Sequence, residues 1–182
     1  AVDYIVSQQP ILIATNTTLA TVNTVQRNRE IPVFMMVAPR PDIAGLRDKS
    51  GKDPSNLFGT YETLDYIDTS AALIHQLFPA ARRVGTIYSQ SESQSVDALN
   101  RLSVMCKKSG LQLEAIPVSN TAETQLITQT LLSKNIDVFF ALPDNVIFSS
   151  FETVLKSCEE KNIPIITSEA GLVSRGAIAS FG

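Results

Sequence analysis

The sequence predicts an α/β protein with a mainly parallel β-sheet and helices on both of its faces. From Arg83 onward, short segments rich in β-branched residues alternate with longer amphipathic segments, and a shorter alternation of the same kind precedes them. This alternation is typical of βαβ units, in which consecutive strands run parallel. The 182 residues are 44% hydrophobic, which is enough apolar surface for the core of one domain or of two small lobes.

The first 56 residues hold the shorter alternation. Helices are expected over residues 2–8 and 19–28, and strands over residues 11–15 and 31–37. The polar segment 47–56 contains Gly51 and Pro54, so it is expected to be a loop or linker, and a domain boundary is placed near Asn56. Two strands and two helices rarely bury enough surface to fold alone. Residues 1–56 are therefore expected to be part of a larger lobe.

Residues 57–182 hold the longer alternation. Strands are expected over residues 83–88, 111–118, 136–141, 163–167 and 177–181, and helices over residues 91–109, 121–133 and 145–161. The helix over 91–109 begins with a capping box formed by Ser91 and Gln94, and Gly110 stands at its carboxyl cap. The helix over 145–161 carries an apolar stripe that would pack on the sheet, made of Ile147, Phe151, Val154, Leu155 and Cys158.

Composition excludes several kinds of partner. The net charge is -3 and no stripe of Lys or Arg is present, so nucleic acid is not an expected partner. No apolar run approaches the roughly 18 residues that a membrane span needs. The first ten residues lack the basic and apolar regions of a secretory signal, so a signal would have been removed upstream if the protein is exported. Cys106 and Cys158 fall on apolar positions of expected helices and are predicted to be buried and free.

The sequence lacks the motifs of common nucleotide, metal and hydrolase sites. Its eight glycines form neither G-x-G-x-x-G nor G-x-x-x-x-G-K-[ST], and no Cys or His pair has the spacing of metal ligands. The single histidine, His75, has no nucleophile indicated nearby. A flavodoxin-like flavin protein is one alternative, because the segment SQSESQS (89–95) is rich in hydroxyls, although it lacks a glycine to close on phosphate. No catalytic residue, metal or cofactor is assigned.

Small polar residues follow the expected strands, at the edge where open parallel sheets bind their ligands. They are Thr15 to Thr18, then Ala38, Pro39 and Arg40, then Ser89 to Ser93, then Pro143, Asp144 and Asn145, and finally Ser168 and Glu169. Hydroxyls, amides and the N–H groups of helix starts suit a carboxylate, whereas Asp144 and Glu169 suit an ammonium. Together they fit a free amino acid, with Tyr61 or Tyr88 offering a flat surface to its side chain. The alternative is that each residue only caps the helix that follows it.

Five segments along nearly the whole chain share a recognisable pattern. They are VFMMVAPRPDIAGL (33–46), LFGTYE (57–62), LFPAARRVGTIYSQSESQSV (77–96), LPDNVIFSSFE (142–152) and IPIITSEAGLVSRGAIASFG (163–182). In order and spacing they resemble the ABC-transporter substrate-binding proteins of the tryptophan/tyrosine-type family, which have the type I periplasmic-binding fold. The resemblance implies part of a first lobe over residues 1–56 and a nearly complete second lobe over residues 57–182.

The same resemblance implies a function. Two lobes would enclose a cleft for a free amino acid, with an aromatic one expected, and would deliver it to a membrane permease. The protein would then be periplasmic or extracellular, with or without a lipid anchor. An alternative is a ligand-sensing domain of a signalling or regulatory protein, because the same fold serves both uses. Neither use requires catalysis.

Ligand contacts can be carried over residue by residue. Those implied are Asn16, Thr17, Thr18, Ala38 and Pro39 in the first lobe, and Tyr61, Glu62, Ser93, Gln94, Ser95, Asp144, Asn145 and Glu169 in the second. Asp144 is expected to bind the ammonium of the ligand, and the turn 16–18 its carboxylate. The chain has Asn16 where family members usually have glycine, and Ala38-Pro39-Arg40 where they have a Thr-Asp pair.

Overall fold

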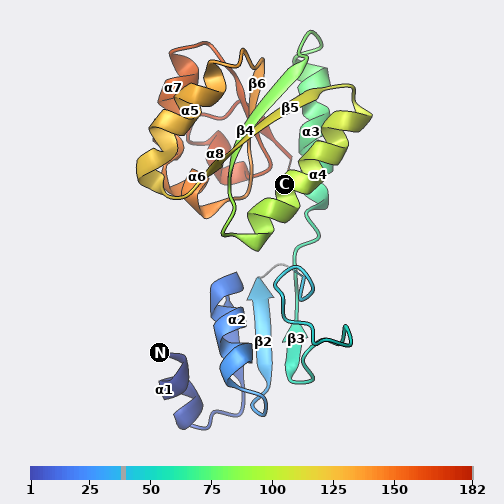
Figure 1. The fold of residues 1–182 in the computed structure, drawn as a ribbon, viewed down its shortest axis with the longest axis vertical. Coiled ribbons are helices and arrows are strands. Elements are labelled where there is room, and N and C mark those ends of the chain that lie inside the picture. Colours follow the sequence, from blue (N-terminus) through green and yellow to red (C-terminus); the bar gives the residue numbers. More distant parts are fainter. Residues whose placement is uncertain (38–39, 182) are drawn as a thin grey trace. The chain divides into compact units, whose positions relative to one another are not determined.

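The computed structural model describes residues 1–37 and 40–181, which form two compact units (Figure 1). The first unit is Ala1–Thr63 and the second is Leu64–Gly182. The boundary therefore lies later than the predicted position near Asn56. The reason is a short strand, β3 (Leu57–Gly59), which was not expected and which pairs with the sheet of the first unit. Each unit is an independent α/β arrangement.

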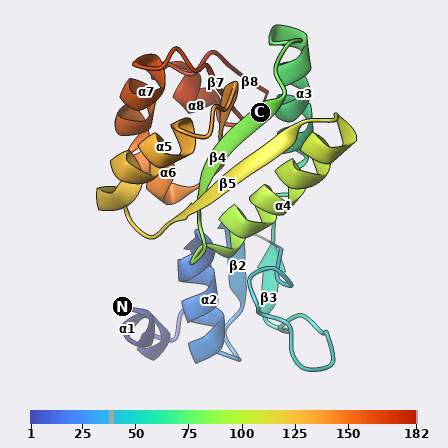
Figure 2. The same cartoon turned by 45° about the horizontal axis from the view of Figure 1, so that its top comes forward.

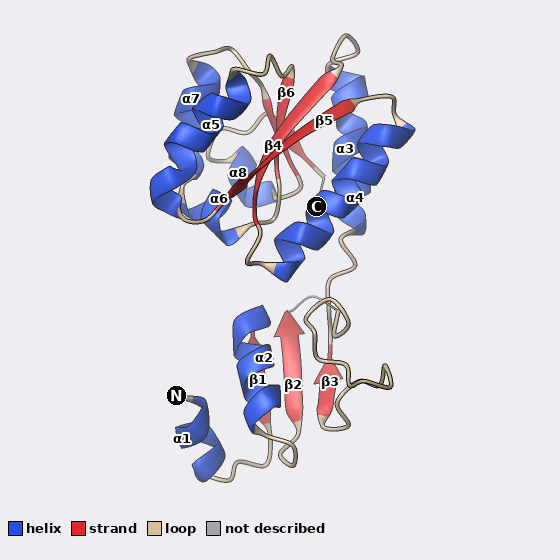
Figure 3. Ribbon diagram, in the orientation of Figure 1, coloured by secondary structure: helices blue, strands red, loops and turns tan. Residues whose placement is uncertain are grey.

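The first unit has a three-stranded parallel sheet in the order β1-β2-β3. Its elements in chain order are α1 (Val2–Ser7), β1 (Ile13–Asn16), α2 (Thr18–Arg27), β2 (Val33–Val37) and β3. Helix α2 packs against β1 and β2, as Figure 3 shows. The core is small: only Val25, Val33 and Leu46 form its fully buried apolar cluster among the described residues. Strand alternation explains this pattern, because Ile13 and Thr15 are buried whereas Ala14 and Asn16 are exposed.

The second unit has a five-stranded parallel sheet in the order β5-β4-β6-β7-β8. The strands are β4 (Arg83–Ser89), β5 (Gln112–Val118), β6 (Val138–Ala141), β7 (Ile165–Thr167) and β8 (Ala179–Ser180). The helices are α3 (Asp65–Leu77), α4 (Ser93–Lys108), η1 (Thr121–Glu123), α5 (Thr124–Leu132), α6 (Asn145–Ser149), α7 (Phe151–Glu159) and α8 (Ala170–Val173). Strand β5 lies on one side of β4, and β6, β7 and β8 follow one another on the other side. The strand order therefore reverses between β4 and β6, and this place is called the reversal point below.

Helices cover both faces of this sheet. Helices α3 and α4 lie side by side on one face, and α5 and α7 lie together on the other (Figures 1 and 2). The strand β6 between them is buried at every residue, and Phe139 and Phe140 have no exposed surface. A parallel sheet needs both faces covered, and uniformly apolar strands are the sequence sign of this. Within the described residues, no helix combines the length and apolar character that crossing a membrane would require.

Two details of the helices differ from the predictions. Helix α4 begins at Ser93 with Glu92 as its N-cap, so the predicted capping box at Ser91 is wrong: the Ser91 hydroxyl lies 2.9 Å from the Ser89 hydroxyl instead. The expected single helix over 145–161 is divided at Ser150, whose hydroxyl donates to the Val146 carbonyl (2.5 Å). A serine that bonds back to its own helix in this way bends or interrupts the helix.

The predicted carboxyl cap of α4 is confirmed. Gly110 has φ +69°, and its N–H donates to the Lys107 carbonyl at 3.3 Å while the Leu111 N–H donates to the Cys106 carbonyl at 2.9 Å. This pair of bonds is a Schellman motif, for which glycine is the favoured residue. Cys106 and Cys158 are buried and free, as predicted. Burial raises the pKa of the Cys106 thiol to about 11 and that of Cys158 to about 12.

Candidate functional site

The turn at the end of β1 exposes three of the predicted residues. Asn16 and Thr17 are exposed and Thr18 is half-buried at the first position of α2. Thr17 is the N-cap of α2, but its side chain makes no capping hydrogen bond among the described residues. Its carbonyl accepts both the Thr21 N–H (3.1 Å) and the Thr21 hydroxyl (2.9 Å). In the part of the chain that the structure describes, the Thr17 side chain therefore leaves the first N–H groups of α2 uncapped, which favours anion binding over capping for this turn.

Thr17 also carries backbone strain. Its φ of 84° and ψ of 156° lie in a region that essentially only glycine adopts, and a β-branched residue there is an outlier. The glycine-like backbone of this turn therefore falls on Thr17, one residue after Asn16. Strained residues of this kind are held in place by surrounding structure and cluster at binding sites.

We expect Thr17→Gly to stabilise the first unit by about 1 kcal/mol, because relief of about 1–3 kcal/mol of strain exceeds the entropy cost of glycine. Urea unfolding, monitored by hydrogen exchange of the α2 amides, measures this change in the stability of the first unit. The matched control is Thr18→Gly, which places glycine within the helix and is expected to destabilise it. Equal destabilisation by both variants would contradict the strain at Thr17.

In the second unit, both oxygens of the Asp144 carboxylate accept hydrogen bonds. It is 1% exposed and follows β6, where it is the N-cap of α6. Its Oδ1 accepts the N–H groups of Val146 (2.8 Å) and Ile147 (3.0 Å), and its Oδ2 accepts the Ser89 N–H (2.7 Å) and the Ser95 hydroxyl (2.5 Å). A carboxylate has about four lone-pair sites, so these bonds use its capacity. This geometry fits the capping interpretation of Asp144 and makes it the link between the ends of β4 and β6.

Glu92 lies beside this link and was missing from the predicted contacts. It is half-buried, and its Oε2 accepts the Asn145 side-chain N–H (2.8 Å). Burial raises the pKa of the Glu92 carboxyl, and the neighbouring charge of Asp144 raises it further. In the described part of the chain, no Lys or Arg forms an ion pair with Glu92 or Asp144. A cationic group from outside would therefore be favoured here. The sequence feature that could have indicated Glu92 is its position in the same loop as Ser93, a predicted ligand contact.

The predicted residues of the second unit share one edge of the sheet. Ser95 and Asp144 are in direct contact, and Asn145, which follows Asp144 in the chain, donates its side-chain N–H to Glu92. Ser93 and Gln94 are half-buried in the first turn of α4, and within the described residues the side chain of its N-cap, Glu92, makes no capping hydrogen bond to this helix. Glu169 follows β7, the strand next to β6, and is also half-buried. These residues follow β4, β6 and β7 at the sheet edge where the strand order reverses between β4 and β6, which is the usual ligand position in open parallel sheets.

One further polar atom at this edge has no partner in the described structure. Ser168 directly follows β7 and is 2% exposed, and its hydroxyl makes no hydrogen bond within residues 1–37 and 40–181. A buried hydroxyl without a partner costs about 1–3 kcal/mol. Sequence reasoning noted Ser168 as a residue after a strand but did not select it.

The remaining predicted contacts fall elsewhere. Tyr61 and Glu62 belong to the first unit and not to the second, because the segment after β3 stays with the first sheet. Tyr61 is 49% exposed and lines a cavity of the first unit. Ala38 and Pro39 lie outside the described residues. His75 has no role in the site, since its Nε2 lies 2.8 Å from the Ser109 carbonyl and ties α3 to the end of α4.

Metal binding has no support in the part of the chain that the structure describes. No group of three or more His, Cys, Asp or Glu side chains there is close enough to hold an ion. The charged residues instead form ion pairs between elements. Arg101 on α4 binds Asp65 and Asp68 on α3, and Arg175 binds Glu152 at 2.8 Å while stacking 5.2 Å from the ring centre of Phe151.

Comparison with known proteins gives one family. Residues 2–182 match the family described as ABC transporter substrate binding protein. A tyrosine-binding protein of Clostridioides difficile is 36% identical over 154 residues, which are 85% of this chain and 44% of that protein.

Solved structures agree with this match. An ABC domain from Streptococcus pneumoniae in complex with L-Trp is 25% identical, with a TM-score of 0.86 over 97% of this chain and 59% of that one. A substrate binding protein with adhesive properties from Clostridium difficile, solved ligand-free and open, is 27% identical, with a TM-score of 0.66 over 97% of this chain and 59% of that one. The chain thus spans between 44% and 59% of the length of these relatives. The α/β fold predicted from the sequence is confirmed by these similarities.

Proposed function

Because the chain belongs to the family of ABC transporter substrate binding proteins, we propose that it is part of the solute-binding component of such a transporter and that the solute is a free aromatic amino acid. A tyrosine-binding relative at 36% identity and an L-Trp complex at 25% identity support this ligand class. Proteins of this family generally act outside the cytoplasm and generally are not enzymes. We extend both properties to this protein, with a membrane permease as its partner.

The reversal point of the second sheet is the observation that carries this proposal. There Asp144 fixes the ends of β4 and β6 through four hydrogen bonds. The uncapped start of α4 offers N–H groups, and Glu92 offers a carboxylate whose ionisation a cation would favour. Donors and an acceptor side by side suit a zwitterion. We therefore propose that Glu92 faces the ammonium of the ligand, while Asp144 holds the neighbouring strand ends in place.

The first unit, taken by itself, also carries hydrogen-bond donors at the end of a strand. The uncapped start of α2 and the side chains of Asn16, Thr17 and Thr18 offer hydrogen bonds to a carboxylate. The strain at Thr17 is consistent with a turn held for binding rather than for stability. Sensing in a regulatory protein would use the same residues, so the ligand can be tested before the two roles are separated.

The test is a thermal-shift series of this chain with L-tryptophan, L-tyrosine, L-phenylalanine, L-leucine and, as a control, a flavin mononucleotide. A ligand at 100 times its Kd stabilises by about 2.7 kcal/mol, which raises the Tm of a protein of this size by roughly 5–10 °C. We expect a rise with an aromatic amino acid and none with leucine or the flavin. A rise with the flavin alone would instead support the flavodoxin-like alternative, and no rise with any amino acid would contradict the proposed ligand class.

A further inference from the structure

The first unit contains a cavity of about 360 Å³, within the usual range for small-molecule sites. All of its lining comes from residues 35–61, so it belongs to one unit. The lining combines charged and apolar side chains: Arg40, Asp42, Arg47 and Asp53, with Met35, Leu57, Phe58 and Tyr61. Two guanidinium groups and two carboxylates make the cavity neutral in net charge, which suits a zwitterion better than a multiply charged anion.

Both arginines of this cavity pair with Asp42 Oδ2, at 3.4 Å from Arg40 Nη2 and 3.8 Å from Arg47 Nη1, and in the described part of the chain Arg47 alone pairs with a second carboxylate, Asp53. The Arg47 Nε donates to Asp53 Oδ1 at 2.8 Å, and this bond raises the pKa of the Arg47 guanidinium. Asp48 closes the same loop by accepting the N–H groups of Ser50 (2.7 Å) and Lys52 (3.0 Å). Arg47 is therefore committed to holding the segment between β2 and β3.

Arg40 has N–H donors that can bind a ligand. Its one ion pair in the described part of the chain, from Nη2 to Asp42 Oδ2, measures 3.4 Å, and its side chain is 45% exposed. A guanidinium has five N–H donors in a planar fork that matches a carboxylate, so a single long contact leaves most of them for a ligand. Arg40 also follows β2, at the same edge of the sheet where β1 ends at Asn16.

Aromatic surface lies in the same cavity. Tyr61 is 49% exposed and Phe58 is 50% exposed, although rings of this size are normally covered. Tyr61 follows β3, the strand beside β2, so it shares the sheet edge with Arg40. A guanidinium beside an exposed ring is an arrangement that binds a molecule with both a carboxylate and an aromatic ring.

We infer that Arg40 binds the carboxylate of the aromatic amino acid in this cavity and that Tyr61 packs against its ring. The inference rests on the proposed function and names the first-unit residues that determine specificity. Asp42, 3.4 Å from Arg40, keeps the guanidinium in the cavity when no ligand is present. The carboxylate of the ligand joins this ion pair, and the neutral cavity then accepts a molecule without net charge.

The experiment compares L-tyrosine with tyramine, which has the same ring and ammonium but no carboxylate, by isothermal titration calorimetry. We expect the unmodified chain to prefer L-tyrosine by about tenfold or more, since charge-assisted bonds of this kind are the strong ones. In Arg40→Gln this preference should shrink toward one, while tyramine affinity stays unchanged. Arg40→Lys, which keeps the charge without the planar fork, should restore only part of the preference.

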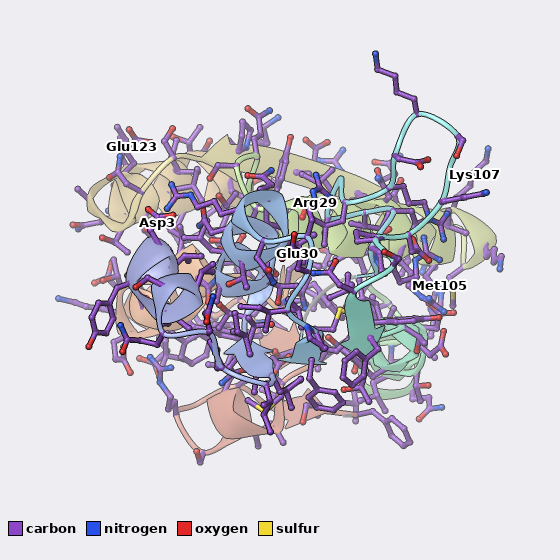
Figure 4. All side chains as sticks on the ribbon, turned by 90° about the horizontal axis from the view of Figure 1, so that it is seen from below. Asp3, Arg29, Glu30, Met105, Lys107 and Glu123 are labelled. Atoms are coloured by element: carbon purple, nitrogen blue, oxygen red, sulfur yellow. The ribbon has the colours of Figure 1, made fainter. Side chains whose placement is uncertain are left out.

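Arg29→Gln is the matched control. Arg29 is an exposed arginine in the turn between α2 and β2, labelled in Figure 4, and it precedes β2 whereas Arg40 follows it. Its substitution removes the same charge from the opposite edge of the sheet and should leave both affinities unchanged. A full preference for L-tyrosine in Arg40→Gln, or an equal loss for both ligands, would overturn the inference. If the unmodified chain binds neither L-tyrosine nor L-tryptophan, the proposed function itself is contradicted, and the role of Arg40 is lost with it.

Discussion

Asp144→Ala is expected to lower the Tm of the second unit by roughly 10 °C, the largest effect of any single polar substitution in this unit. The variant removes the acceptor of four hydrogen bonds at a position that is 1% exposed. Three of the four donors are backbone N–H groups, which cannot rotate toward a new partner, although the Ser89 N–H also donates to the Ser95 hydroxyl at 3.2 Å. Buried donors without a partner cost about 1–3 kcal/mol each when water cannot reach them, and partial hydration reduces the sum to about 3 kcal/mol.

Asp137 provides the matched control for this prediction. Its Oδ2 also accepts two backbone N–H groups, from Arg82 (2.7 Å) and Arg83 (2.8 Å), but Asp137 is exposed. Water can replace that carboxylate, so Asp137→Ala should cost only about 1 kcal/mol. Asp144→Asn keeps the shape of the side chain, but its NH2 group faces hydrogen-bond donors instead of accepting from them. We expect this variant to recover little of the Tm lost in Asp144→Ala. Differential scanning calorimetry measures all three, and equal Tm values for Asp144→Ala and Asp137→Ala would contradict the assigned role.

Gly59→Ala is expected to separate β3 from β2 and to destabilise the first unit by about 3 kcal/mol or more. Gly59 has φ +137°, and a Cβ on it would lie 2.0 Å from the Met35 carbonyl oxygen and 2.8 Å from the Met35 nitrogen. Both atoms are backbone in the paired strand, so they cannot move without breaking the sheet. The small core around Val25, Val33 and Leu46 offers little to offset that loss.

Hydrogen exchange is the measurement that isolates this effect. The Val33 N–H donates to the Asn56 carbonyl at 2.7 Å and the Thr60 N–H to the Met35 carbonyl at 3.0 Å, so these amides report on the pairing of β2 with the segment around β3. Both should exchange faster in Gly59→Ala. Gly45→Ala is the control, because Gly45 also has positive φ (+67°) but no atom within 4 Å of its added Cβ. Slow exchange at Val33 and Thr60 in Gly59→Ala would show that the strands tolerate a side chain there.

Much of the second unit could be predicted from its sequence because local and tertiary signals agree there. The strand over Val138–Ala141 is apolar at every position and is buried at every position, and Gly110 ends α4 as expected. The structure of the second unit differs from the prediction where side chains form hydrogen bonds with the backbone or with each other. Ser150 divides the last long helix through its bond to the Val146 carbonyl, and no hydrophobic periodicity contains that information.

The site was predictable as a set of strand-end residues but not as a set of roles. From the sequence alone, Asp144 and Thr17 each had the same two interpretations: a cap of the following helix or a ligand contact. In the described structure the Asp144 carboxylate caps α6, whereas the Thr17 side chain does not cap α2. Ligand contact by either residue stays a prediction. Arg40 was not selected, because its relation to Tyr61 depends on how the segment between β2 and β3 folds back. That path is a tertiary property without a local pattern.

The two buried thiols give the second unit an internal reporter. Both cysteines of the chain, Cys106 on α4 and Cys158 on α7, belong to this unit, one under each layer of helices. With pKa values raised to about 11 and about 12, almost no thiolate exists at neutral pH, and burial blocks access by reagents. Alkylation therefore requires the second unit to open. The first unit contains no cysteine, so the alkylation rate measures the opening of the second unit alone, even when both units are present in one chain.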